Sequence, residues 1–183
     1  MKQGKLGGKK LSFPIIHIIG LPGAGKTTLA KKLSSRLNLP VLRIGEYRSK
    51  YPPSPIGEAD AWVALYRELS KRKWRNCIVE TCGLNQRECF LKVAPPFLQR
   101  ITVKLEAPQR ILYRRIGEKK KRDRRGQWLF SADYPDKYGF VRNLCGEFRK
   151  LSSDIRIDTT RLKPKEVFEI ALEKIEKYKI LFS

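Results

Sequence analysis

One short string constrains the fold of this chain more than any other feature. Residues 20–27 are Gly-Leu-Pro-Gly-Ala-Gly-Lys-Thr, which fits the pattern G-x-x-x-x-G-K-[ST] at every fixed position. The β-branched run at residues 15–19 predicts a buried strand before it, and the leucine spacing of residues 26–37 predicts a helix after it. In this context the backbone N–H groups of the glycine-rich turn point inward and cradle phosphate groups. The string therefore predicts a phosphate-binding loop.

Two side chains of the string add chemistry to that backbone. Lys26 can reach the β- and γ-phosphates of a nucleotide, and the hydroxyl of Thr27 can hold a magnesium ion. We therefore expect ATP and Mg²⁺ as cofactors. The residues expected to contact the nucleotide are Gly20, Leu21, Pro22, Gly23, Ala24, Gly25, Lys26, Thr27 and Thr28.

The rest of the chain alternates short apolar runs with helical patterns. Further strands are predicted at residues 41–44, 77–80, 101–105 and 155–158. Helices are predicted around Trp62 and Tyr66, from Pro108 onward, and from Pro164 onward. This alternation predicts an α/β protein with the three-layer P-loop NTPase fold, in which a mostly parallel sheet of about five strands carries helices on both faces. We expect a basic arm at residues 1–12 and a single domain at residues 13–183.

Composition excludes several classes of protein. A total of 40 Lys and Arg against 18 Asp and Glu gives a net charge of +22, which indicates phosphate-rich partners. No apolar run reaches the roughly 20 residues of a membrane span, so a cytoplasmic location and no membrane partner are expected. The four cysteines lack C-x-x-C spacing and there is one histidine, so reduced thiols are favoured over a zinc site. An NKxD string is absent, which disfavours a GTPase.

Three further motifs stand at predicted strand ends. Residues 45–48 are Gly-Glu-Tyr-Arg after the second strand, Glu80 follows two apolar residues of the third, and residues 105–115 lead from the fourth into a basic helix. Together with the phosphate loop, this order resembles the nucleotide-kinase-like phosphate-loop kinases. Within them it is most similar to the branch of polynucleotide 5′-hydroxyl kinases and zeta-toxin-like kinases. The resemblance extends from residue 15 to about residue 178.

The resemblance implies roles for individual residues. Glu46 would accept the proton of the attacking hydroxyl as general base, and Arg48 would grip a phosphate of the acceptor. Glu80 would hold Mg²⁺ through water, beside Thr27, or would position the acceptor. Relatives usually carry aspartate at the position of Glu46, and their arginine often stands one residue farther along, so this chain departs from the family pattern at both places.

The resemblance also implies a basic lid at about residues 115–145. Relatives place one arginine on the helix that leads into the lid and another about four residues later. Arg115 matches the first, and Lys119 stands at the second, with Arg122 nearby. A lid cation over the γ-phosphoryl group would stabilise the negative charge that spreads over its oxygens during transfer.

The size of the acceptor is inferred from charge alone. Basic residues cluster at residues 1–10, 67–75 and 110–125, with Trp74, Trp128 and Tyr134 within or beside these stretches as candidates for base stacking. We therefore expect a kinase that acts on a hydroxyl of DNA or RNA, either a 5′ end or a hydroxymethylated base. Two alternatives remain open. One is a small-molecule kinase acting on a nucleotide, nucleoside or metabolite, and the other is a nucleotide-dependent nucleic-acid-binding module.

Overall fold

A computed structural model of the chain describes residues 13–52, 54–84, 95, 98–122 and 136–181. The predicted arm at residues 1–12 lies outside the described residues, as do Trp128 and Tyr134. Of the predicted lid, residues 123–135 are likewise outside, while the flanking helical residues are described.

One parallel sheet holds the five described strands. Its order is β2-β3-β1-β4-β5, and every neighbouring pair is parallel. The strands are β1 (Ile15–Gly20), β2 (Val41–Arg43), β3 (Ile78–Thr81), β4 (Arg100–Glu106) and β5 (Ile155–Asp158). Each residue of β1 is buried, because β1 is the central strand and both of its faces are covered. The predicted parallel α/β sheet of about five strands is confirmed.

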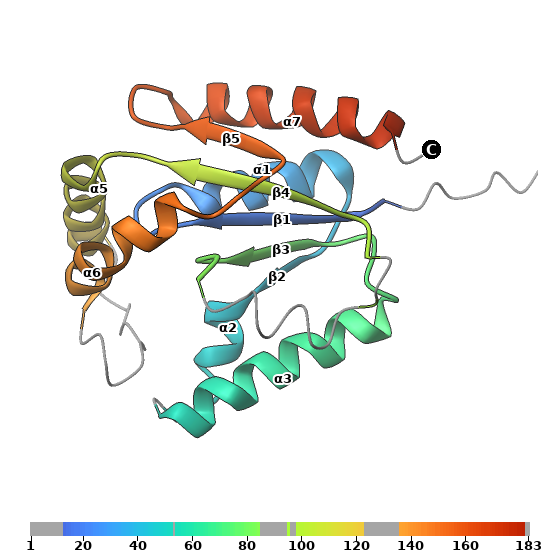
Figure 1. The fold of residues 1–183 in the computed structure, drawn as a ribbon, viewed down its shortest axis with the longest axis horizontal. Helices are drawn as coiled ribbons and strands as arrows, with labels where there is room; N and C mark the ends of the chain where they lie inside the picture. Colours follow the sequence, from blue (N-terminus) through green and yellow to red (C-terminus); the bar gives the residue numbers. More distant parts are fainter. Residues whose placement is uncertain (1–12, 53, 85–94, 96–97, 123–135, 182–183) are drawn as a thin grey trace, which may run out of the picture.

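The helices cover both faces of the sheet and the edge at which its strands end. They are α1 (Lys26–Leu37), α2 (Ile44–Arg48), α3 (Pro55–Lys71), α5 (Gln109–Arg122), α6 (Lys137–Arg149) and α7 (Pro164–Leu181). Helices α1 and α7 contact each other on one face, whereas α2 and α3 lie on the other (Figure 1). Helices α5 and α6 contact each other beyond the ends of β1 and β4 (Figure 1). The predicted three layers are confirmed, and the sequence analysis missed α2 and α6.

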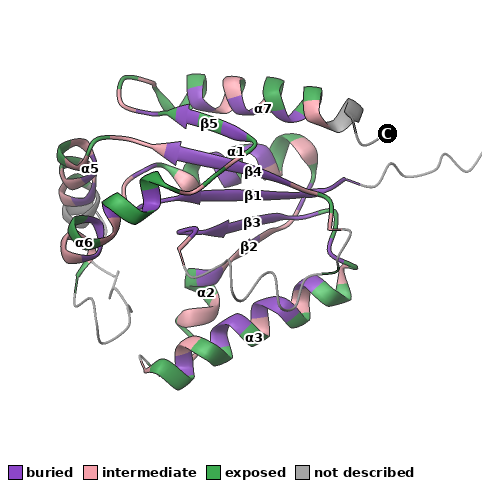
Figure 2. Cartoon of the chain, viewed as in Figure 1, coloured by how far each residue is buried: buried purple, intermediate pink, exposed green. Residues whose placement is uncertain are grey.

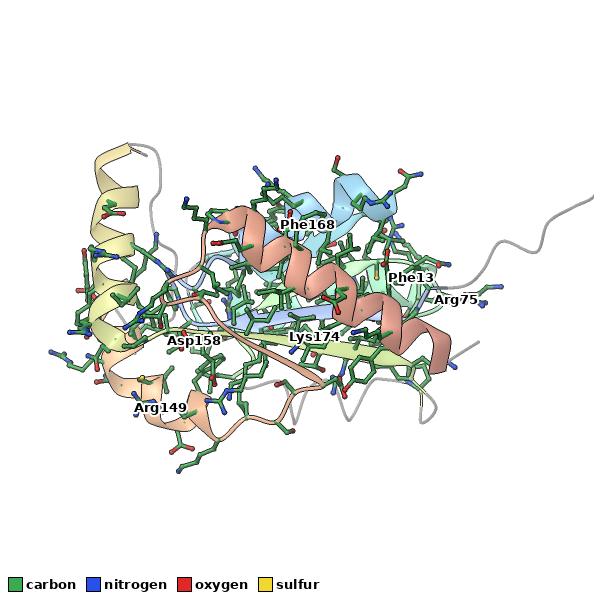
Figure 3. All side chains as sticks on the ribbon, turned by 90° about the horizontal axis from the view of Figure 1, so that it is seen from above. Phe13, Arg75, Arg149, Asp158, Phe168 and Lys174 are labelled. Atoms are coloured by element: carbon green, nitrogen blue, oxygen red, sulfur yellow. The ribbon has the colours of Figure 1, made fainter. Side chains whose placement is uncertain are left out.

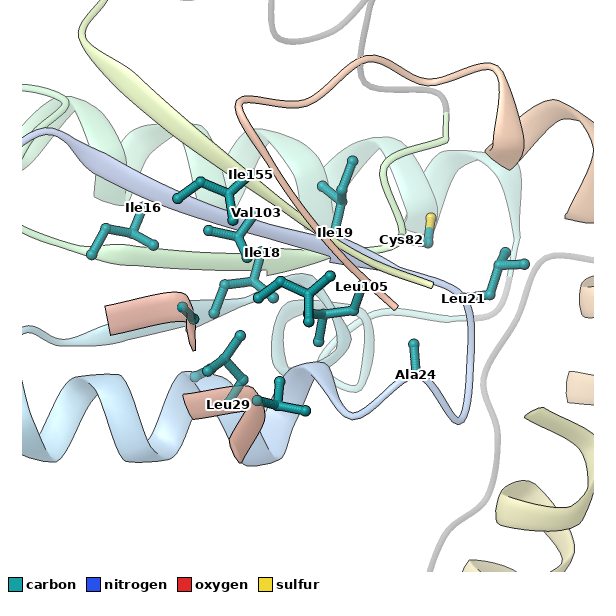
Figure 4. Close-up of a cluster of buried hydrophobic side chains, with 14 of the residues drawn as sticks. Ile16, Ile18, Ile19, Leu21, Ala24, Leu29, Cys82, Val103, Leu105 and Ile155 are labelled. Carbon is teal, nitrogen blue, oxygen red and sulfur yellow. The ribbon is translucent and has the colours of Figure 1, made fainter. Parts of the chain in front are cut away.

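Apolar side chains fill the space on each side of the sheet. On one side, Ile18 of β1 and Leu105 of β4 lie toward Leu29 of α1, as Figure 4 shows. On the other, Val79 of β3 and Leu65 of α3 belong to a separate buried cluster. Burial is therefore continuous along the central strands and limited to one side of α1, α3 and α7 (Figure 2).

The described cysteines are consistent with the reduced thiols expected from the sequence. Cys77, Cys82 and Cys145 are free and buried, and Cys89 lies outside the described residues. Burial raises the pKa of the Cys77 thiol to about 12, which keeps this thiol protonated and unreactive.

The one histidine of the chain gives the fold a pH dependence. His17 of β1 is buried, its Nε2 lies 3.1 Å from the hydroxyl oxygen of Thr81, and burial lowers its pKa from 6.5 to about 3. The unfolded chain therefore binds a proton between pH 6.5 and pH 3 that the folded chain excludes. The stability this provides is complete above pH 6.5 and is lost as the pH falls toward 3.

We expect the free energy of unfolding to lose about 2 kcal/mol between pH 7 and pH 5 through His17 alone. Urea unfolding at the two pH values, compared between the parent chain and His17→Gln, measures this contribution. The difference between the pH values should shrink by about that amount in His17→Gln, because glutamine does not titrate. An unchanged difference would show that His17 is readily protonated in the folded chain.

Candidate active site

The phosphate loop occupies the turn between β1 and α1. Gly23 and Gly25 have φ angles of +83° and +97°, a region that favours glycine. A Cβ on Gly23 would lie 2.8 Å from the carbonyl oxygen of Leu112, so this turn also approaches the backbone of α5 closely. A Cβ placed on Gly25 would meet no atom within 4 Å, so there is room for a ligand beside the backbone of this residue.

The first turn of α1 is suited to an anion. Gly25 is the N-cap residue and offers no side chain to the N–H groups of that turn, which also contains no acidic residue. The positive end of the helix dipole and these N–H groups therefore face the loop. Lys26 donates from Nζ to the carbonyl oxygen of Leu21 at 3.2 Å, which folds the lysine back over the loop. The backbone conformation from Gly20 to Thr28 is therefore compatible with the predicted contacts to a nucleotide.

Thr27 and Glu80 meet at the carboxyl edge of the sheet. The Thr27 hydroxyl donates to Glu80 Oε1 at 2.8 Å, which joins the start of α1 to the carboxylate on β3. The Glu80 side chain is 9% exposed. The two predicted metal ligands are therefore brought together by the fold, although 53 residues separate them in the chain.

A third residue completes this group, and the sequence analysis did not identify it. Arg43 donates from Nε to Glu80 Oε2 at 2.9 Å and from a terminal nitrogen to the Thr27 hydroxyl at 3.3 Å. Its other terminal nitrogen lies 2.9 Å from Glu46 Oε1. The register places Arg43 directly beside Glu80, because β2 pairs with β3. That pairing is the signal that could have found Arg43, and it requires the strand order.

A cleft of about 890 Å³ opens over the phosphate loop. One side is lined by the loop and α1, and the other by the end of β2, the start of α2 and the end of β3. Among the predicted site residues, Arg48, Glu80, Arg115 and every residue from Pro22 to Thr28 line it. Glu46 does not line it, and its side chain, which is 57% exposed, is paired with Arg43 of the cleft wall. Lys119 and Arg122 lie on α5, but their side chains are outside the described part of the chain.

Arg48 is engaged by a partner from α3. Its Nε donates to Glu58 Oε2 at 2.7 Å, and a terminal nitrogen pairs with the other oxygen of the same carboxylate. Glu58 also accepts from the indole N–H of Trp62 at 2.9 Å. This bidentate pair neutralises the guanidinium locally. A phosphate of the acceptor would therefore have to compete with Glu58 for Arg48.

Arg115 is fixed where α5 faces β5. Its guanidinium donates to the side-chain oxygen of Thr159 at 2.9 Å and to the carbonyl oxygen of the same residue. The Thr159 hydroxyl in turn donates to the carbonyl oxygen of Glu106 at 3.0 Å. Burial, with Arg114 acting in the same direction, lowers the pKa of Arg115 from its usual value. Arg115 thus lines the cleft from α5, and its guanidinium is held by Thr159, the residue that follows β5.

Comparison with known proteins identifies the fold and the family. The fold and the phosphate loop define an ATP-dependent phosphotransferase with the P-loop kinase fold, as the sequence predicts. The chain belongs to the family described as AAA domain, whose model matches residues 16–136. No curated protein matches the sequence.

Solved structures with this fold include several kinases of small molecules. Shikimate kinase from Acinetobacter baumannii is 20% identical, with a TM-score of 0.64 and coverage of 91% of this chain and 95% of that one. A gluconokinase from Sinorhizobium meliloti is 14% identical, with a TM-score of 0.65 and coverage of 92% and 95%. APS kinase from Mycobacterium tuberculosis is 15% identical, with a TM-score of 0.60 and coverage of 90% and 98%. These likenesses show the fold.

The prediction of a nucleic-acid acceptor is wrong. The solved structures that match include shikimate kinase, a gluconokinase and APS kinase, and these favour the small-molecule alternative over the polynucleotide kinase branch. One of the three candidate stacking residues also has another role, because Trp74 is 8% exposed and stacks on Tyr66 in the core. The basic stretch at residues 67–75 directly precedes β3 and so lies at the opposite edge of the sheet from the cleft. Figure 3 shows Arg75 at the end of the molecule away from α5.

No membrane-spanning segment is found in the described part of the chain, since none of its helices is both long and apolar enough.

Proposed function

We propose that this chain is a Mg²⁺-dependent kinase that transfers the γ-phosphoryl group of ATP to a hydroxyl of a small molecule. The observation that carries the proposal is the meeting of Thr27 and Glu80 at 2.8 Å in a cleft shared by the phosphate loop and the end of β2. Nucleotide-side and acceptor-side residues thus line one space. The shared fold with kinases of shikimate, gluconate and APS supports a small acceptor.

The donor groups present fit a magnesium ion. Mg²⁺ prefers oxygen ligands and is usually held by one or two protein groups together with phosphate oxygens and water. Thr27 and Glu80 supply a hydroxyl and a carboxylate. Among the described residues there is no cluster of three or more His, Cys, Asp or Glu that would form an all-protein cage. When bound with the nucleotide, the ion would neutralise charge that develops on the phosphate oxygens.

Other residues of the chain bind the phosphates, accept the proton and contact the acceptor. Lys26 and the N–H groups at the start of α1 hold the phosphates in line. Arg115 faces the same space from α5, and Lys119 or Arg122 would add charge from the predicted lid. Glu46 is the proposed general base, paired with Arg43. Arg48 is the proposed acceptor contact, and it would bind an anionic group only by exchanging its Glu58 partner.

Consumption of ATP in the presence of candidate acceptors tests this proposal. The panel contains sugars, hydroxy acids, nucleosides and mononucleotides, with single-stranded DNA and RNA as macromolecular arms, each at low and high salt. We expect at least one small acceptor to raise ADP formation above the acceptor-free rate, with little dependence on salt. Transfer confined to DNA or RNA, or no stimulation by any acceptor together with no binding of ATP, would refute the proposal.

A further inference from the structure

Arg43 occupies an unusual position for a cation. It contacts the two residues proposed to hold magnesium, Thr27 and Glu80, and also the proposed general base. Two carboxylates share its guanidinium, each with an oxygen 2.9 Å from a nitrogen. The Arg43 side chain is 30% exposed, so it is seated within the cleft wall and not extended into solvent.

The fold holds this guanidinium in place. Arg43 is the last residue of β2, and its neighbour in the sheet is Glu80 of β3. Directly after it, α2 begins at Ile44, whose side chain is buried and fixes the turn. Because a guanidinium presents several N–H groups in one rigid plane, it can bridge separate oxygen groups, which a lysine ammonium does less well. The contacts therefore follow from the backbone and from the shape of the side chain.

The contacts of Arg43 are those that a magnesium ion would require. Both cations need the negative charge of Glu80 and a lone pair on the Thr27 oxygen. Two cations that depend on the same carboxylate and hydroxyl would repel each other strongly in a partly buried site. The guanidinium of Arg43 must therefore move away from these groups when magnesium binds.

We propose that Arg43 is the resident counter-cation of the metal site, which magnesium displaces when it enters with the nucleotide. This inference rests on the proposed function, because it assumes that Thr27 and Glu80 hold the ion. In the nucleotide-free chain Arg43 neutralises Glu80 and keeps the Thr27 hydroxyl oriented. On metal entry Arg43 gives up these two contacts and retains Glu46. Arg43 is thus a positioning residue that sets how much Mg²⁺ is needed for nucleotide binding.

Binding of ADP at a series of Mg²⁺ concentrations, measured by calorimetry, tests the proposal without requiring turnover. Arg43→Gln should lower the Mg²⁺ concentration that gives half-maximal enhancement of ADP binding by about tenfold, within the range seen when groups around metal ligands are changed. Lys32→Gln is the matched control. Lys32 also lines the cleft, and its ammonium lies 5.8 Å from the ring centre of Phe168 on α7. It should leave the half-maximal concentration within about twofold of the parent chain, since an exposed charge is largely screened.

Three results would overturn the inference. They are an unchanged or higher Mg²⁺ requirement in Arg43→Gln, an equal decrease in Lys32→Gln, or ADP binding by the parent chain that is insensitive to Mg²⁺. Failure of the parent chain to bind ADP at any Mg²⁺ concentration would instead refute the proposed function itself.

A second measurement uses the parent chain, so the test does not depend on the folding of Arg43→Gln. The Nε–H resonance of Arg43 in ¹⁵N spectra can be assigned by its absence from Arg43→Lys. It should move when ADP and Mg²⁺ are added together and stay in place when ADP is added with EDTA. A resonance that stays in place in both cases would contradict displacement.

Discussion

Replacement of Lys26 by alanine is expected to lower kcat for phosphoryl transfer by about 100- to 1000-fold, the loss typical when a preorganised charge at the reacting group is removed. Lys26 stands at the first position of α1, and its Nζ is held over the loop by the carbonyl oxygen of Leu21 at 3.2 Å. From there it can reach the β- and γ-phosphates, where charge develops during transfer. The measurement is the ADP formation rate with an acceptor from the panel, at saturating ATP.

The control for Lys26→Ala is Lys32→Ala. Both lysines lie on α1 and line the cleft, so each replacement removes one positive charge from the same helix. Lys32→Ala should retain kcat within about twofold, because Lys32 is exposed and lies nearly two turns beyond the loop. Thermal unfolding of both variants checks that the fold is intact. Near-parental turnover in Lys26→Ala would show that the loop does not support catalysis.

The parts of the fold that the sequence predicts are those that depend on patterns of neighbouring residues. The phosphate loop is a contiguous string, and the helix over residues 26–37 ends where expected, with Asn38 in the left-handed conformation at its C-cap. The strands are short β-branched or apolar runs, and the central strands β1 and β3 are buried on both faces. Such runs are visible because a parallel sheet covered by helices selects them. Strand boundaries differ from the predicted ones by at most one residue, as with Ile44, which begins α2 instead of ending β2.

The helices that were missed have weaker local signals. Helix α2 has only five residues, too few for a period to show. Helix α6 begins with Asp136 as N-cap, which accepts from the backbone N–H of Gly139, and it buries Phe140, Val141 and Phe148. These signals are present in the sequence, but they directly follow a basic stretch that resembles a kinase lid, and the lid predicted at about residues 115–145 overlaps the start of α6.

Residues of the candidate site that stand far apart in the chain could be predicted one by one, but only the contiguous phosphate loop could be predicted as a unit. Residues 20–28 belong to one turn, whereas the contacts of Arg43 with Glu80 depend on β2 pairing with β3. The partner of Arg48 is equally nonlocal, since Glu58 lies on another helix. The net charge led to a wrong prediction of the acceptor, because it does not show where in the fold the basic residues lie. The net charge of +22 includes a basic stretch at the far edge of the sheet, and Trp74 beside it is part of the core.

Replacement of Glu80 by glutamine is expected to lower kcat by about 100-fold and to raise the Mg²⁺ concentration for half-maximal activity by 10- to 100-fold. Glutamine keeps the size of the side chain and can still accept from the Thr27 hydroxyl, so the loss reports the carboxylate charge. A magnesium titration of ADP formation measures both effects. Loss of activity without a change in Mg²⁺ requirement would show that Glu80 does not serve the metal.

The matched control for Glu80→Gln is Glu118→Gln. Glu118 also lines the cleft, but its side chain is 52% exposed and its ion partner Arg114 is 3.9 Å away, so its replacement should change kcat and the Mg²⁺ requirement by less than about twofold.

The double variant Glu80→Gln with Arg43→Gln tests whether Arg43 and magnesium act through the same carboxylate. If Arg43 and magnesium compete for the same carboxylate, removing Arg43 should no longer lower the Mg²⁺ requirement once that carboxylate is gone. The two replacements would then be strongly non-additive, as expected for residues that share one partner. Additive effects would mean that Arg43 acts on the metal by a route that does not include Glu80.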